Sequence, residues 1–203
     1  EIQATSAACK AFYTWTTLSN IEKCRRACGG HGYSMYSGIP QLFLNYMAAV
    51  TYEGDNTVLA QQPPKLLLSL FGSQLKNKRA IGNFGFLVDN SPNPGGLEHE
   101  GFGSWLFGRV TAVLVSALIL KLKQLTEAGV DRKTRENSLT QQDNLLVSKA
   151  YCFYFTVKAF EATVSQVEEA EARRLLTLLK QVYIITCAIE LGSVILKEQV
   201  LSR

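Results

Sequence analysis

A single carboxylate, Glu53, lies in a sequence context suited to proton abstraction. It stands between an aromatic residue and a glycine and is followed by three small polar residues, in the segment Thr51-Tyr52-Glu53-Gly54-Asp55-Asn56-Thr57-Val58. A carboxylate becomes a stronger base where apolar neighbours desolvate it, and the side chains that could do so are Phe43, Tyr46, Met47 and Tyr52. The alternative is a surface acid at a helix N-terminus, which the helix dipole would stabilise.

A glycine-rich segment precedes this carboxylate, with the sequence Cys24-Arg25-Arg26-Ala27-Cys28-Gly29-Gly30-His31-Gly32-Tyr33. Gly29 is expected to end a helix, and Gly30 and Gly32 are expected to form a loop whose backbone approaches another group closely. His31 could either contact a ligand or satisfy a turn. The two cysteines and the histidine lack a fourth ligand at a familiar spacing, so no metal site is predicted.

The composition excludes several classes of protein. With 47% apolar and 19% charged residues, the chain is typical of a soluble globular protein. The basic residues behind its net charge of +4 are dispersed, so nucleic-acid binding is not expected. An odd number of cysteines favours free thiols and an intracellular setting. The most apolar run, Val110–Leu120, is too short to span a bilayer, which predicts a buried helix rather than a transmembrane one.

Apolar residues recur at helical spacing along most of the chain and no strand pattern is convincing, which predicts an all-α fold. The chain begins inside such a segment, which runs to Leu18, and a second short helix is expected over Ser19–Cys28. Ile39–Val50 could be helical or extended. Another helix is expected from Asp55, and Pro63-Pro64 should bend or restart it.

Residues 82–103 hold six glycines and two prolines, which predicts a linker between two helical-bundle domains, 1–81 and 104–203. The first helix after the linker, 103–127, should be buried on most sides because its middle is apolar all round. Two further helices carry apolar stripes that are expected to face the core: Leu146, Ala150, Phe153, Val157, Phe160, Val164 and Val167 in one, and Leu175, Leu178, Val182, Ile185 and Ile189 in the other.

The segments Cys24–Tyr33 and Thr51–Leu59 together resemble the acyl-CoA oxidases, flavoenzymes of peroxisomal fatty-acid oxidation within the acyl-CoA dehydrogenase fold. The resemblance is specific over about Ile2–Leu70, and the second helical domain favours the oxidase branch over a plain dehydrogenase. It implies that Glu53 removes the α-proton of an acyl-CoA thioester while the β-hydrogen passes as hydride to FAD. Oxygen would then be reduced to hydrogen peroxide, and the backbone N–H of Glu53 would help to hold the thioester carbonyl.

The resemblance also implies a site shared between subunits. Gly29 and Gly30 would meet the FAD of a neighbouring subunit with bare backbone amides, so a homodimer is the expected working unit. The further flavin contacts that it implies are Arg26, Asp55 and Thr57, and the implied acyl-CoA contacts are Tyr52, Glu53 and Gly54.

Several features depart from the family pattern. Oxidases often carry Cys or Pro near the positions of Ala48–Val50, where this chain has neither, and Pro63-Pro64 interrupts a helix that is usually smooth. The implied location is the peroxisome, although Leu201-Ser202-Arg203 is not a terminal signal of the Ser-Lys-Leu kind. The family's chains are expected to extend beyond both ends of this one, with further domains that complete the flavin site. The alternative is a non-catalytic paralogue whose helices serve dimerisation or partner binding.

Overall fold

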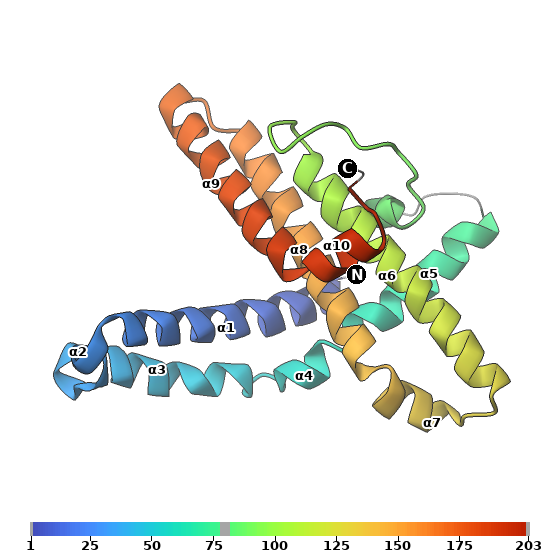
Figure 1. Ribbon diagram of the computed structural model, residues 1–203, viewed down its shortest axis with the longest axis horizontal. Helices are drawn as coiled ribbons and strands as arrows, with labels where there is room; N and C mark the ends of the chain where they lie inside the picture. Colours follow the sequence, from blue (N-terminus) through green and yellow to red (C-terminus); the bar gives the residue numbers. More distant parts are fainter. Residues whose placement is uncertain (1, 78–81, 202–203) are drawn as a thin grey trace.

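The computed structural model describes residues 2–77 and 82–201. Every regular element within these ranges is helical, so the predicted all-α class is confirmed. Figure 1 shows an arm of paired helices, formed by the first part of the chain, that projects from a group of longer crossing helices. The long helices are α1 (Ile2–Ala27), α5 (Gln62–Asn77), α6 (Phe102–Glu127), α8 (Gln141–Ser165) and α9 (Ala170–Glu190).

The first arm helix, α1, is continuous, so the prediction of a separate helix over Ser19–Cys28 is wrong. No proline or glycine interrupts it, and its hydrogen-bond ladder continues through Ser19. The N-terminal half buries a row of small side chains, which lets neighbouring helices approach closely; the row consists of Ala4, Ala7, Ala8 and Ala11.

The glycine-rich segment is also helical, which corrects the predicted loop. Gly29–Tyr33 forms the short helix α2, with Gly29 at a φ of +54° where the chain turns back after α1. The predicted close approach occurs at Gly32, because a Cβ atom there would lie 1.8 Å from the carbonyl oxygen of Arg25. Glycine is therefore required at this corner for a steric reason.

The return half of the arm resolves two of the open alternatives. Ile39–Met47 forms the helix α3, which packs along α1 and is followed by the 3-10 turn η2 (Ala48–Val50). Beyond the turn that carries Glu53, the short helix α4 (Asn56–Leu59) ends before the start of α5. Pro63-Pro64 lies in the first turn of α5, where no backbone N–H is needed, so these prolines restart the helix as predicted.

The predicted linker contains the 3-10 helix η3 (Gly82–Leu87) and an irregular stretch that leads to the start of α6 at Phe102. The aromatic rings of η3 pack on α8, with Phe86 and Tyr154 centroids 4.1 Å apart. The buried core is continuous and includes Ala8 and Leu67 from before this segment. Position 81, the predicted end of the first domain, lies outside the described residues, and the division of the chain into two domains stays a prediction.

The helix pair α6 and α8 forms the centre of the fold. Ten residues of α6 are buried, which confirms its expected core position. The short helix α7 (Arg132–Thr134) and the π-helical turn η4 (Arg135–Leu139) connect the pair. The predicted stripe on α8 does face the core, since Ala150, Val157 and Val164 are buried. By length and composition alone α6 could also cross a membrane, but 44% of its most apolar window is buried in the fold, and core helices pass the same test.

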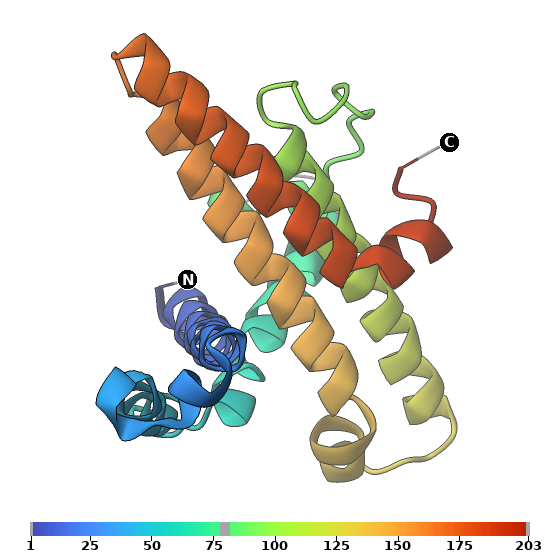
Figure 2. The same ribbon diagram turned by 60° about the vertical axis from the view of Figure 1, so that its left-hand side comes forward.

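The predicted core stripe of α9 is wrong. Figures 1 and 2 show α9 lying along α8, with the short helix α10 (Gly192–Lys197) after it. The face of α9 that is buried carries Lys180, Ile184 and Cys187. The predicted residues are instead between 46% and 74% exposed; they are Leu175, Leu178, Val182, Ile185 and Ile189. Two faces of α9 are apolar, so helical periodicity could not decide between them.

Candidate functional site

Glu53 lies in the exposed turn between η2 and α4, in a conformation unusual for its residue type. Its φ is +59°, in the left-handed region, and that of Gly54 is +109°. A non-glycine residue in this region costs on the order of 1 kcal/mol, which surrounding contacts must offset. Within the described residues no hydrogen bond from the Glu53 amide is found, so this exposed N–H is available to water or a ligand.

The turn is fixed to α1 by a polar network centred on the buried side chain of Asn56. The ammonium of Lys10 donates to the carbonyl oxygen of Gly54 at 2.7 Å and to Oδ1 of Asn56 at 2.8 Å. The amide of Asn56, which is 1% exposed, donates to the carbonyl of Ala11 at 3.0 Å and to Oγ1 of Thr14 at 2.8 Å. These bonds hold the backbone on the C-terminal side of Glu53 in a single position.

Lys10 and Asn56 thus position the Glu53 turn, a role that was not predicted from the sequence. The available signal was on α1, where Lys10 stands between the apolar residues Cys9 and Ala11, and a half-buried ammonium gains from a partner. The ammonium also lies 6.0 Å from the ring centroid of Tyr52. Tyr52 itself is 54% exposed.

Asp55 acts as the N-cap of α4. Its Oδ1 accepts hydrogen bonds from the backbone N–H groups of Thr57 at 2.9 Å and Val58 at 3.3 Å. Capping bonds of this kind stabilise a helix by about 1 kcal/mol. Thr57 is exposed. Asp55 therefore has a structural role as a cap. The expected contacts of Asp55 and Thr57 with a flavin stay predictions.

The apolar surroundings expected for Glu53 are not formed by the described residues. Glu53 is exposed, and Met47 and Tyr52 are 46% and 54% exposed. Phe43 and Tyr46 are only partly buried on α3. Because a carboxylate needs an enclosed, water-poor setting to gain basicity, a further surface would have to cover this turn.

The glycine segment lies far along α1 from the point where the Glu53 turn contacts this helix. Lys10 anchors the Glu53 turn, whereas Gly29 and Gly30 follow the far end of that helix, and Figure 1 shows α2 at the tip of the arm. The helix between Lys10 and Ala27 rises about 25 Å at roughly 1.5 Å per residue. One copy of the chain therefore does not bring the two predicted segments together.

The tip of the arm is open to a partner or ligand. Arg26, Gly29, Gly30 and His31 are all exposed, and a Cβ atom at Gly29 or Gly30 would meet nothing within 4 Å. Cys24 and Cys28 are exposed free thiols. Across the described ranges, no group of three or more His, Cys, Asp or Glu side chains could hold a metal ion.

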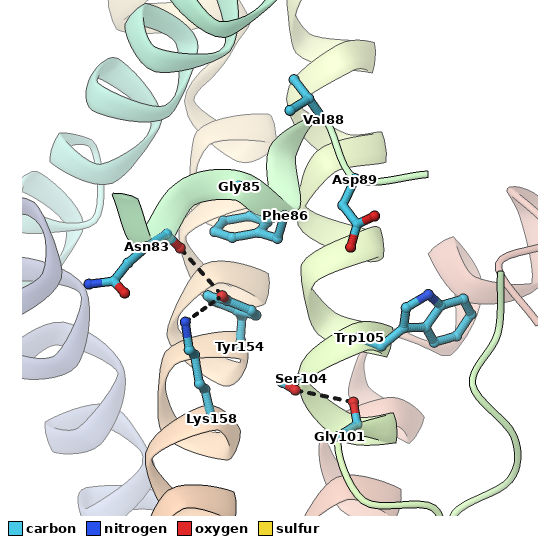
Figure 3. A pocket seen from close by; sticks show the side chains of 10 residues that line it. All are labelled: Asn83, Gly85, Phe86, Val88, Asp89, Gly101, Ser104, Trp105, Tyr154 and Lys158. Carbon is cyan, nitrogen blue, oxygen red and sulfur yellow. Dashed lines mark hydrogen bonds between the residues drawn. The ribbon is translucent and has the colours of Figure 1, made fainter. Parts of the chain in front are cut away.

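A cavity of about 620 Å³ lies among η3, α6 and α8, away from the Glu53 turn. In Figure 3, Lys158 and Tyr154 lie side by side on α8, and Lys158 Nζ donates a hydrogen bond of 3.3 Å to the phenolic oxygen of Tyr154. Hydrogen bonds from Ser91 lower the pKa of Asp89, another lining residue, so this carboxylate stays charged. No sequence pattern marks Lys158, Tyr154 or Asp89, and these side chains come together only through packing.

Two family comparisons match most of the chain. The family model described as acyl-CoA oxidase, C-alpha1 domain, matches residues 1–68, which include the arm and the Glu53 turn. The model described as acyl-CoA oxidase matches residues 106–203. The chain belongs to the acyl-CoA oxidase family. The two matches lie on either side of η3 and the irregular stretch that follows it.

Relatives support this membership over nearly the whole chain. Peroxisomal acyl-coenzyme A oxidase 1 of Mus musculus is 31% identical over 189 residues, covering 87% of this chain and 28% of the mouse protein. The Bos taurus protein of the same name is 32% identical over 200 residues, covering 90% of this chain and 29% of the bovine protein. This oxidase-family chain thus spans less than a third of the length of these relatives.

Solved structures share the fold. Acyl-CoA oxidase 3 from Yarrowia lipolytica superposes with a TM-score of 0.86 at 26% identity, covering 98% of this chain and 29% of that one. Acyl-CoA oxidase 2 of Caenorhabditis elegans, solved with FAD, ascaroside-CoA and ATP bound, gives a TM-score of 0.87 at 24% identity, covering 96% of this chain and 30% of that one. The arm and the crossing helices are therefore the fold of this part of the oxidases.

Proposed function

We propose that this chain supplies the catalytic base of an acyl-CoA oxidase, with Glu53 removing the α-proton of an acyl-CoA thioester. The observation that carries the proposal is the Glu53 turn. Its backbone is strained at Glu53, whose carboxylate and amide are exposed, and Lys10 and Asn56 tie the turn to α1. This turn lies in the segment matched by the C-alpha1 domain family.

The proposed chemistry uses two groups of Glu53, its side-chain carboxylate and its backbone amide. Its carboxylate accepts the α-proton, and its amide N–H donates to the thioester carbonyl, where negative charge develops as that proton leaves. Tyr52 and Gly54 flank the thioester. The bonds from Lys10 hold the backbone that follows Glu53, so that little reorganisation of the turn is needed at the moment of transfer.

The tip of the arm fits FAD held by a neighbouring subunit. Gly29 and Gly30 leave open space in which backbone amides meet phosphate or ribose oxygens, and Arg26 provides a cation beside them. Bound there, FAD supplies the hydride acceptor and the reduced form that reacts with oxygen. The separation of this tip from Glu53 along α1 supports a homodimer in which each flavin meets two chains.

The experiment uses the full-length protein and measures flavin absorbance together with acyl-CoA-dependent hydrogen peroxide. Glu53→Gln should retain flavin and lose turnover by a factor of about 10³ or more, because the amide cannot accept the proton. Glu100→Gln, which changes an exposed acid in the stretch before α6, is the matched control and should leave turnover unchanged. A wild-type protein that neither holds FAD nor makes peroxide would refute the proposal.

The second candidate is a non-catalytic member of the family that binds a partner through its helices. The exposed apolar stripe of α9 favours it, because such faces mark interaction sites. The same experiment separates the two functions, since this member would lack peroxide production in both wild type and Glu53→Gln. The location proposed for either is the peroxisome, after the names of the relatives.

A further inference from the structure

Two cysteines lie where α1 crosses α8, and a third lies near one of them on α9. Cys9 lies on α1, Cys152 on α8 and Cys187 on α9, and all three are free thiols. Cys152 and Cys187 are buried, at 1% and 3% exposed. Cys9 is partly buried and packs on the core, so it is the member of the cluster that solvent can reach.

Two hydrogen bonds fix the register of the crossing. The Thr5 and Tyr151 hydroxyls lie 2.7 Å apart, and so do those of Tyr13 and Thr156. Cys9 lies midway between Thr5 and Tyr13, one helical turn from each. On α8, Cys152 lies between the two partners of these hydroxyls. The Cys9 and Cys152 side chains therefore lie opposite each other at the crossing, close enough for each thiol to shift the pKa of the other.

The two thiols have unlike chemistry. Interaction with the Cys152 thiol lowers the pKa of Cys9 to about 7, against the opposing effect of partial burial, and the Tyr13 hydroxyl acts in the same direction as Cys152. The interaction with Cys9 and its own burial raise the pKa of Cys152, which stays a thiol. A thiolate is the nucleophile in reactions with peroxides, so Cys9 is the cysteine expected to react with peroxide. Cys152 lies where it could then form a disulfide with the oxidised Cys9.

We propose that Cys9 is an oxidation site for hydrogen peroxide and that Cys152 resolves it as a disulfide between α1 and α8. The Cys9 thiolate attacks one peroxide oxygen and hydroxide leaves, which oxidises the sulfur to a sulfenic acid. The Cys152 sulfur then attacks the Cys9 sulfur and expels the hydroxyl group, which leaves as water with the thiol proton. In total, two thiols and one hydrogen peroxide give one disulfide and two waters.

The position of this bond links it to the candidate site. Lys10, the residue after Cys9, holds Gly54 and Asn56 at the Glu53 turn. A covalent bond at Cys9 would thus restrain α1 one residue from the side chain that positions Glu53. The proposed oxidase reaction would produce the oxidant locally, and only this source rests on the proposed function, because the thiol chemistry proceeds with added peroxide.

The test treats full-length protein with added hydrogen peroxide, blocks remaining thiols and analyses the unreduced digest by mass spectrometry. A cross-linked pair of peptides containing Cys9 and Cys152, released by dithiothreitol, is the expected product. Cys152→Ser keeps a hydroxyl donor beside Cys9 and should abolish this product, while a sulfenic acid trapped by dimedone accumulates on Cys9. Cys24→Ser, at an exposed thiol of the arm, is the matched control and should leave the yield unchanged.

Two outcomes would overturn the proposal. One is oxidation of Cys24 and Cys28 while Cys9 stays reduced, and the other is a Cys9 sulfenic acid in wild type that never joins Cys152. Because peroxide is added, either outcome is independent of oxidase turnover. A protein that makes no peroxide from acyl-CoA but forms the cross-link would refute the proposed function and retain this one.

Discussion

Lys10 on α1 and Asn56 at the start of α4 are joined by a hydrogen bond of 2.8 Å, although 46 positions separate them in the sequence. This bond, with the one from Lys10 to the Gly54 carbonyl, ties the Glu53 turn to the longest helix of the arm. The geometry of the candidate base thus depends on a residue far from it in the chain.

Removal of the Lys10 ammonium should loosen this turn. Lys10→Met keeps the length of the side chain but leaves Oδ1 of the buried Asn56 without its donor, which should lower the free energy of unfolding by about 1–3 kcal/mol. In the full-length protein, turnover should fall with KM little changed. Lys65→Met, at an exposed position of α5, is the control for denaturant unfolding and should alter stability by less than about 0.5 kcal/mol. Equal effects of the two variants would show that the Lys10 bonds do not stabilise the turn.

The two glycines of α2 should respond differently to alanine. Gly32→Ala places a Cβ atom against the Arg25 carbonyl and should lower the free energy of unfolding by about 1–3 kcal/mol. Gly30→Ala has open space and should leave the melting temperature unchanged or raise it slightly. If the tip of the arm meets FAD, Gly30→Ala should nonetheless weaken flavin retention in the full-length protein. Thermal melts and flavin absorbance of both variants test these two roles separately.

Adjacent isoleucines of α9 should differ in their effect on stability. Ile184 is 2% exposed and Ile185 is 46% exposed. Ile184→Ala should cost about 2–4 kcal/mol because it leaves a cavity against α8, whereas Ile185→Ala should cost less than about 1 kcal/mol in this chain. Urea unfolding of the 203-residue chain measures both. A larger loss of stability in Ile185→Ala than in Ile184→Ala would show that the stripe with Ile185 faces the core, as the sequence predicted.

Alkylation of Cys9 should rise with pH around a midpoint of about 7. Only the deprotonated thiolate reacts, so a lowered pKa moves the rise in rate to lower pH. Cys152→Ala removes the thiol that lowers this pKa, and the midpoint should then move upward, toward about 8.5. Iodoacetamide labelling read at the Cys9 peptide gives the profile. A midpoint that does not move in Cys152→Ala would show that Cys152 does not lower the pKa of Cys9.

The isolated 203-residue chain should lack tightly bound FAD. The Glu53 turn and the Gly29-Gly30 tip are exposed and lie apart along α1, so one copy offers no enclosed cofactor pocket at either place. The purified chain should be colourless, and addition of FAD should produce little change in its absorbance or fluorescence. Recovery of a yellow chain with stoichiometric flavin would contradict this expectation.

Local sequence was sufficient to predict the features of the fold that depend on a single segment of the chain. The all-α class, the restart of a helix at Pro63-Pro64 and the core face of α8 follow from periodicity and from backbone constraints that act within a few residues. The family resemblance, based on the Glu53 and glycine segments, is supported by both family matches. Proton abstraction by Glu53 itself remains a proposal.

Tertiary structure decided the features that depend on contacts between segments far apart in the sequence. Periodicity identified two apolar faces on α9, and only packing against α8 selected the one with Ile184. The anchoring of Glu53 by Lys10 and the meeting of Cys9 with Cys152 required helix crossings that no local pattern encodes. The physical reason is that propensity and periodicity act over one or two helical turns, whereas these contacts depend on the relative placement of whole helices.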